Sequence, residues 1–185
     1  WGFEFEDQPW YAGFRDMATN GVDKPVLNVF RMFGIMEFNR LKVEGDFDYD
    51  YKKISDASVR DNPDVNALAS RGENAVTVMV FNYHDRNAIQ VKPTPVTLNL
   101  EAIPSNKVLV SQYRVDEQFS NSYTAYKAMG SPKNPTLEQI DQLEQAGQLE
   151  LFTSPQYMQV KDGKLTLNLD LPRQGVALFK VEFMP

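Results

Sequence analysis

Short apolar stretches, separated by turn residues, run through the last two thirds of the chain and constrain its fold most. The stretch Ala75–Tyr83 is rich in valine, and Asp162-Gly163 is the strongest signal for a two-residue hairpin turn. Strands at this spacing, with no helix between most of them, indicate an antiparallel β-sandwich rather than β-α-β units. The other predicted strands are Ala67–Ser70, Val96–Leu100, Val108–Val115, Leu149–Phe152, Leu165–Leu169 and Val176–Phe183.

One helix is predicted within this β-rich region, near residues 136–146. Thr136 is a suitable N-cap, and Gln139 three residues later completes a capping-box pattern. Ile140 and Leu143 lie three residues apart and give the segment an apolar face. We therefore assign residues 65–185 to a sandwich domain with one inserted helix.

Residues 1–38 follow a different pattern. The segment Trp1–Phe5 alternates like a strand, and Pro25 opens a helical stretch in which Val26, Phe30 and Phe33 recur at helical spacing. A second helix is predicted from Tyr11 to Ala18, before a turn at Asn20-Gly21. A strand followed by a helix is half of a β-α unit and forms no core alone. We expect a longer polypeptide to supply the rest, upstream of Trp1.

Residues 39–64 are polar and poorly periodic. Acidic and aromatic residues alternate between Gly45 and Tyr51. This composition predicts a linker that crosses between the two parts of the chain, with one edge strand.

Charge and composition exclude several classes of function. The net charge of −6 argues against partners such as nucleic acid or an anionic membrane surface, which need clustered Lys and Arg. No apolar run approaches the roughly 20 residues of a membrane span. The absence of cysteine and the single histidine, His84, remove disulfides, most zinc sites and most Ser-His triads. We predict no metal and no cofactor, and expect Asp85 or a backbone carbonyl to hold His84.

Acidic residues after the first predicted strand are the leading candidates for chemistry. Glu4 and Glu6 share one strand face about 7 Å apart, near the carboxylate separation of glycoside hydrolases. Neighbours on one strand flank a substrate poorly, so solvated acids at a strand end are the alternative. Trp1 and Trp10 border these acids, and their rings suit either sugar stacking or a core. A second candidate is the polar, aromatic segment 112–132, whose alternative role is a structured connection tied down by Arg114 and Asp116.

Two separated blocks of sequence resemble glycoside hydrolase family 39. Within that family, the chain most resembles the β-xylosidases. The first block resembles the family's last barrel strand and helix, and the second its C-terminal region. The matching residues are Trp1–Pro9, Ala18–Phe30, Tyr113–Asp116, Ser120-Asn121, Tyr123-Thr124, Met129–Pro132 and Leu171–Val176.

The resemblance implies the last β-α unit of a (β/α)8 TIM barrel, followed by the β-sandwich. Members are retaining exo-hydrolases with two catalytic glutamates, about 5–5.5 Å apart, on earlier barrel strands that this chain does not contain. Neither Glu4 nor Glu6 matches them, so the hypothesis of a catalytic pair on one strand is withdrawn. The matching tryptophan borders the sugar of the first subsite, and two acids bind its hydroxyls; these roles are carried onto Trp1, Glu6 and Asp7. Phe119 stands where relatives often have histidine.

The resulting hypothesis is the C-terminal portion of a retaining β-xylosidase-like hydrolase that acts on xylo-oligosaccharides or other β-glycosides. The chain alone is predicted to be inactive and to act with the rest of its catalytic domain. Two alternatives stay open: a free-standing carbohydrate-binding or structural β-sandwich module, and a sandwich that mediates homo-oligomerisation. The compartment is unknown, since any signal peptide would lie upstream of Trp1.

Overall fold

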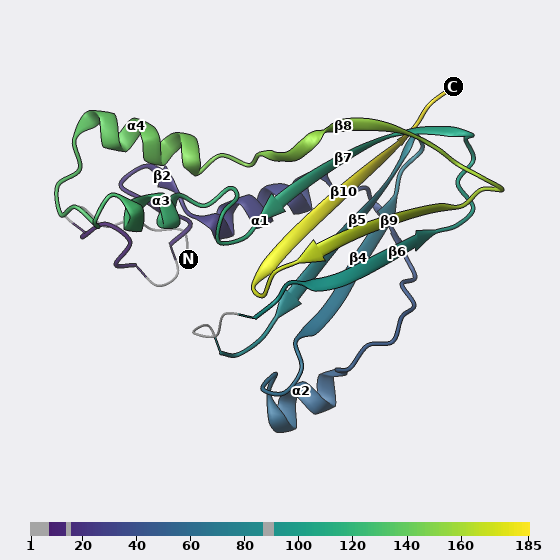
Figure 1. The fold of residues 1–185 in the computed structure, drawn as a ribbon, viewed down its shortest axis with the longest axis horizontal. Helices are drawn as coiled ribbons and strands as arrows, with labels where there is room; N and C mark the ends of the chain where they lie inside the picture. The colour runs from purple at the N-terminus through teal and green to yellow at the C-terminus, as the bar shows by residue number, and fades with distance from the viewer. Residues whose placement is uncertain (1–7, 14–15, 87–90) are drawn as a thin grey trace. The chain divides into compact units, whose positions relative to one another are not determined.

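The computed structural model describes residues 8–13, 16–86 and 91–185, which form two compact units (Figure 1). Within the described residues, unit 1 comprises residues 8–13, 16–34 and 114–150, and unit 2 comprises residues 35–86, 91–113 and 151–185. The elements of the described residues are β1 (Ala18–Thr19), β2 (Val22–Asp23), α1 (Pro25–Ile35), β3 (Asn39–Leu41), α2 (Tyr51–Ala57), β4 (Asp64–Arg71), β5 (Ala75–Tyr83), β6 (Thr94–Leu100), β7 (Lys107–Val115), α3 (Ser122–Ala128), α4 (Leu137–Ala146), β8 (Leu151–Gln159), β9 (Leu165–Leu171) and β10 (Gly175–Phe183).

Unit 2 contains two sheets of unequal size. The larger has six strands in the order β3-β4-β5-β10-β7-β8, and the smaller pairs β6 with β9. The β3–β4, β4–β5, β5–β10, β7–β8 and β6–β9 pairs are antiparallel. The prediction of a mostly β chain with antiparallel strands is therefore confirmed.

The two sheets share one hydrophobic core. Strand β9 shows the pattern most clearly, because its four leucines are buried and the residues between them are exposed. The core lies between the facing sides of β5, β10 and β7 in the larger sheet and β6 and β9 in the smaller one. Its buried members are Ala69, Val76, Val78, Val80, Leu100, Ile103, Val108, Val110, Val160, Leu165, Leu167, Leu169, Leu171, Ala177, Phe179 and Val181.

The turn predicted at Asp162-Gly163 is confirmed. Both residues have positive φ, 52° and 69°, as a two-residue hairpin turn with the twist of the strands requires. The backbone N–H of Lys164 donates to the Lys161 carbonyl at 2.8 Å and closes the turn.

In unit 1, two of the predicted elements begin where the sequence indicates. Helix α1 starts at Pro25, and α4 starts after the N-cap Thr136, whose hydroxyl accepts from the Gln139 N–H while the Gln139 side chain accepts from the Thr136 N–H. The Asn20-Gly21 turn joins β1 to β2, with φ of 46° and 84°.

The predicted helix from Tyr11 to Ala18 is wrong. Tyr11 has a φ of 57°, and Ala18 belongs to the short hairpin β1–β2. The backbone N–H of Tyr11 donates to the Thr19 hydroxyl at 2.9 Å. The left-handed backbone at Tyr11 thus excludes the helix that the apolar spacing suggested, because helical residues have φ near −63°.

Helices α2 and α3 were not predicted. Helix α2 lies in the segment predicted as a linker, and its N-cap Asp50 accepts from the Lys53 N–H. Helix α3 lies in segment 112–132, and its N-cap Asn121 accepts from the two N–H groups at 123 and 124. Residues 114–150, assigned above to the sandwich domain, group in unit 1 with the described residues up to Gly34.

Candidate functional site

The sugar-binding residues predicted from the sequence, Trp1, Glu6 and Asp7, lie outside the described residues, as does the predicted strand Trp1–Phe5. The structure begins immediately after them, with the loop of residues 8–13. This loop and the side chains that support it are therefore the described part of the candidate site.

Two buried polar side chains hold the loop of residues 8–13 against the β1–β2 hairpin. The Thr19 hydroxyl accepts from the Tyr11 N–H at 2.9 Å, and the Lys24 ammonium donates to the Gly13 carbonyl at 3.0 Å. Thr19 and Lys24 are 5% and 9% exposed. Because these bonds are shielded from water, they fix the chain directly C-terminal to the predicted acids.

Three tyrosine rings join the loop to helix α3. The Tyr11 ring centroid lies 5.2 Å from that of Tyr123 and 4.7 Å from that of Tyr126. Burial raises the pKa of the Tyr11 phenol, so this group stays neutral at physiological pH. Trp10 and Tyr11 pack against the buried cluster of Val22, Tyr126 and Leu143. Trp10, whose ring the sequence left open to sugar stacking or a core, therefore packs against this core together with Tyr11.

A buried ion pair starts the segment that leaves β7 toward α3. The Nε atom of Arg114 donates to Oδ2 of Asp116 at 2.6 Å, and both side chains are under a tenth exposed. The other carboxylate oxygen accepts from the N–H groups of Gln118 and Phe119 at 2.7 and 3.0 Å. Arg114 and Asp116 thus bind each other, and Asp116 also organises the following turn. That they tie the segment to the sandwich stays a prediction.

Asn28 on α1 links both ends of the helical segment that contains α3 and α4. Its Nδ2 atom donates to the carbonyls of Ser120 at 3.0 Å and of Gly147 at 2.7 Å, and its Oδ1 atom accepts from Arg31 at 2.8 Å. Asn28 is fully buried. Gly147 approaches closely, since a Cβ atom there would lie 2.9 Å from the Asp23 carbonyl oxygen. The only sequence signal for this contact was a polar residue, Asn28, inside a helical stretch but outside its apolar pattern.

His84 has a structural role. Its Nδ1 atom accepts from the Arg86 N–H at 3.0 Å, so Nε2 carries the proton and faces the Asp61 carbonyl at 3.3 Å. The expectation that a backbone carbonyl holds this ring is confirmed. Among the described residues, no group of three His, Cys, Asp or Glu side chains is arranged to hold a metal ion. None of the helices in the described ranges is long and apolar enough to cross a membrane.

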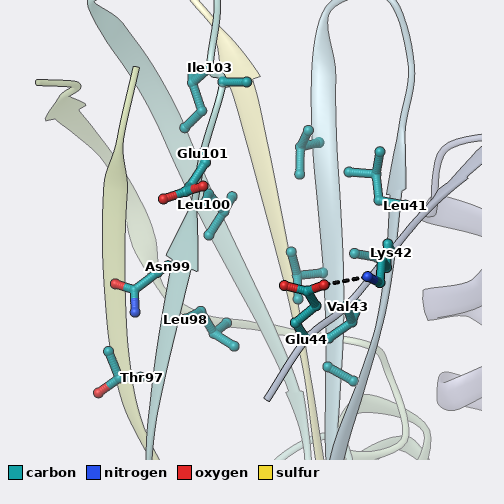
Figure 2. Close-up of a pocket in the computed structure, with 15 residues that line it drawn as sticks. Leu41, Lys42, Val43, Glu44, Thr97, Leu98, Asn99, Leu100, Glu101 and Ile103 are labelled. Carbon is teal, nitrogen blue, oxygen red and sulfur yellow. Dashed lines mark ion pairs between the residues drawn. The ribbon is translucent and has the colours of Figure 1, made fainter. Parts of the chain in front are cut away.

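Unit 2 contains a hollow of about 680 Å³ that the sequence analysis did not predict (Figure 2). Strands β4 and β5 contribute the apolar side chains Ala67, Ala69, Val76 and Val78. Segment 41–44 lines one side, where Lys42 and Glu44 form an ion pair, and residues 97–103 line the other. No aromatic ring of the described residues lines the hollow, so it lacks the flat apolar surface on which sugars stack.

Comparison with known proteins places these observations in a family. The model of the family described as glycosyl hydrolases family 39 matches residues 3–158. Mouse alpha-L-iduronidase is 28% identical over 166 residues, which cover 85% of this chain and 25% of that protein.

Two solved structures share the fold with a TM-score of 0.75 each. They are the family 39 enzyme of Xanthomonas axonopodis pv. citri, 17% identical, and a monomeric beta-xylosidase of Caulobacter crescentus CB15, 16% identical. Each match covers 96% of this chain and 34% of the other chain. The chain thus spans about a third of these enzymes and a quarter of the mouse relative.

Proposed function

The chain belongs to glycosyl hydrolases family 39, and from this premise we propose that it is the C-terminal portion of a retaining glycoside hydrolase that removes terminal β-xylosyl residues. The observation that carries the proposal is the family match over residues 3–158 in a chain that spans 34% of the matched enzymes. The complete polypeptide is called the parent enzyme below.

The exposed face of α1 supports a larger catalytic domain. Asn28 and Met32 on one face are fully buried, whereas Val26, Phe30 and Phe33 on the opposite face are 45%, 51% and 48% exposed. A contiguous apolar stripe of this kind marks an interaction surface. In the proposal, α1 is the last helix of a (β/α)8 barrel, and this stripe packs against the remainder of the barrel.

The domain boundaries follow from the same proposal. Residues 1–38 form the terminal strand and helix of the barrel, residues 39–64 cross between domains, and residues 65–185 form the sandwich. The segment with α3 and α4 is an insertion in that sandwich which returns to α1 through Asn28. The free-standing module gains no support from the hollow, because no aromatic ring of the described chain lines it.

The residues at the sugar have binding roles in this proposal, and both catalytic glutamates belong to the absent part of the barrel. Active sites of such barrels lie at the C-terminal ends of the strands, and Glu6 and Asp7 follow the predicted strand Trp1–Phe5 at that end. Trp1 forms an apolar wall, and the two carboxylates accept hydrogen bonds from sugar hydroxyls.

The charge of Glu6 and Asp7 favours a neutral sugar. An iduronide carries its own carboxylate, which two nearby acids would repel, whereas a xyloside presents only hydroxyl groups. The mouse relative is named an alpha-L-iduronidase and one structural relative a beta-xylosidase, so both glycones are suitable to test.

The test is the turnover of aryl glycosides by the purified parent enzyme. We expect the highest kcat/KM for the aryl β-D-xyloside and a much lower value for the aryl α-L-iduronide. The opposite order would overturn the proposed specificity and leave a glycoside hydrolase. Absence of turnover for β-D-xylosides, α-L-iduronides and α-L-arabinosides alike would overturn the hydrolase itself.

A further inference from the structure

Tyr11 has a backbone conformation that tyrosine rarely adopts. The Ala12 N–H donates to the Pro9 carbonyl at 3.0 Å, so residues 9–12 form a β-turn with Tyr11 at its third position. Tyr11 has a φ of 57°. A positive φ at this position is typical of a type II turn, which normally has glycine or asparagine there. A bulky residue in this region is an outlier, because its Cβ atom crowds the backbone.

The contacts of the Tyr11 ring explain why a tyrosine stands at a position that favours glycine. The ring centroid lies 4.7 Å from that of Tyr126 and 5.2 Å from that of Tyr123, both on α3. Aromatic pairs at such distances attract each other. Tyr126 is 8% exposed, and its hydroxyl donates to the Pro132 carbonyl at 3.2 Å, so the ring that contacts Tyr11 is itself fixed.

The backbone around Tyr11 is also anchored. The Tyr11 N–H donates to the Thr19 hydroxyl at 2.9 Å, and the Asn20 side chain donates to the Gln8 carbonyl at 3.4 Å. Residues in sparsely populated backbone regions persist only where their surroundings hold them there, and such residues cluster at functional sites. The two hydrogen bonds and the ring contacts hold Tyr11 in this way. The strained turn therefore points to a function of the chain beside it.

The chain beside the turn carries the two acids of the proposed sugar site. Asp7 is two residues before Pro9, where the turn begins, and Glu6 is three residues before it. Two residues of extended chain span at most about 7 Å. The place and direction of the turn therefore limit where the two carboxylates can lie. A displacement of about 1 Å at such a site can lower turnover about 100-fold.

We propose that Tyr11 is a positioning residue for the sugar-binding acids Glu6 and Asp7, and that α3 locks Tyr11 in place through Tyr126. The inference rests on the proposed function, which assigns the two acids to the sugar. Helix α3 belongs to segment 112–132, for which the sequence left open a role in chemistry or as a structured connection. In this proposal the segment acts on the sugar site through the Tyr11 ring.

A double-mutant cycle in the parent enzyme tests the proposal. Tyr11→Gly removes the ring, whereas glycine adopts a positive φ without strain, so the turn itself can still form. We expect kcat/KM for the aryl β-D-xyloside to fall about 10- to 100-fold. In a parent enzyme that already carries Glu6→Ala and Asp7→Ala, the same change should lower kcat/KM less than about 2-fold, because no acid is left to position.

Further variants separate positioning from a general loss of stability. Tyr11→Phe keeps the ring and should retain most of the activity that Tyr11→Gly loses. Tyr49→Ala removes another buried tyrosine, 5% exposed in unit 2, and should lower the free energy of unfolding without changing kcat/KM. Circular dichroism at the assay temperature shows whether each variant is folded. If Tyr11→Gly does not fold, Tyr126→Leu replaces it in the cycle, because leucine is apolar and unstrained in a helix.

The outcomes distinguish this inference from the proposed function. In an active parent enzyme, the inference alone is overturned by an unchanged kcat/KM in Tyr11→Gly, by an equal loss with and without the two acids, or by a Tyr11→Phe variant as impaired as Tyr11→Gly. An active parent enzyme that tolerates the loss of both acids overturns their binding roles together with the inference and leaves the hydrolase. A parent enzyme that hydrolyses no aryl glycoside overturns the proposed function itself, and with it the sugar site that Tyr11 would position.

Discussion

The two units are stabilised by different kinds of contact. Within the described residues of unit 2, sixteen buried apolar side chains form one cluster. In unit 1, the buried apolar cluster within the described part has three members, Val22, Tyr126 and Leu143. Buried polar side chains supplement it: Asn28, Arg114, Asp116, Ser120 and Ser122.

This difference has an energetic meaning. Burial of one leucine side chain contributes about 1.5–3 kcal/mol, whereas one hydrogen bond contributes about 0.5–1.5 kcal/mol net and costs more when one partner is left alone. Unit 2 can therefore reach stability by burial, while unit 1 depends on a few specific bonds. Unit 1 also exposes the stripe of Val26, Phe30 and Phe33, which the parent enzyme would cover.

The largest expected effect concerns catalysis, which the proposal assigns to neither unit. Retaining hydrolysis needs two carboxylates on opposite sides of the glycosidic bond, and both are expected outside this chain. The purified 185-residue chain should release no aryl alcohol from an aryl β-D-xyloside above a buffer blank, while the parent enzyme does. Turnover by a sample of the chain shown free of other glycosidases would mean that one of its own acids is catalytic.

The next effect tests the difference in stabilisation directly. In Asn28→Ala, the carbonyls of Ser120 and Gly147 lose their donor in a buried site, which costs about 1–3 kcal/mol for each group left unpaired. Hydrogen exchange should show faster opening of α3 and α4, with the strands of unit 2 unchanged.

The matched variant in unit 2 is Leu167→Ala, at a core position that is 5% exposed. The cavity should cost about 2–5 kcal/mol and speed exchange in β6 and β9, with α3 and α4 unchanged. If either variant lowers protection equally in both units, the units unfold as one cooperative body and the comparison fails.

Local signals allowed much of the fold to be predicted. The turn at Asp162-Gly163 and the capping box of Thr136 and Gln139 depend on neighbouring residues alone, and both are confirmed. The helix predicted from Tyr11 failed because Tyr11 has a φ of 57°, outside the right-handed helical region, and Ala18 pairs with Asp23 in the β1–β2 hairpin.

Sequence patterns could not predict the long-range contacts. Asn28 bonds to carbonyls 92 and 119 residues away, and no local pattern specifies such partners. The hollow beside β6 depends on which strands the chain leaves unpaired, which is a property of the whole topology. The sugar-binding roles of Trp1, Glu6 and Asp7 stay predictions.

A smaller effect is expected for a substitution at the predicted sugar-binding residue Glu6. It tests whether the two units differ in function. A carboxylate that accepts from a sugar hydroxyl contributes about 1.5–3 kcal/mol, so Glu6→Ala in the parent enzyme should lower kcat/KM by about 10- to 150-fold. Azide should not restore activity, because Glu6 is not the nucleophile. Glu73→Ala, at an exposed turn of unit 2, is the control and should leave kcat/KM unchanged. An unchanged value for Glu6→Ala would reduce Glu6 to a solvated acid, and rescue by azide would assign it to the chemistry.

The smallest effect concerns Asp64, a buried charged side chain of unit 2 with an unpaired carboxylate oxygen. Asp64, at the start of β4, is 6% exposed, and its Oδ1 atom has no hydrogen-bond partner within the described residues. Burial raises the pKa of this carboxyl above its ordinary value of 3.8. Well below pH 3.8 the group is protonated in both the folded and the unfolded chain, and its raised pKa then has no effect on stability. As the pH rises, the unfolded chain ionises first, so stability falls until the folded carboxyl ionises as well, and the loss then stays constant.

An asparagine side chain at this position would carry no charge at any of these pH values, so Asp64→Asn should stabilise unit 2 at about pH 7 and gain less at about pH 3.5. Denaturant unfolding of both proteins at the two pH values measures this as a double difference, in which the titration of all other groups cancels. An equal gain at both pH values would show that the charge of Asp64 is not the cause. A loss of stability at neutral pH would show that the carboxylate has a favourable partner, and unit 2 would then depend on a specific polar contact as unit 1 does.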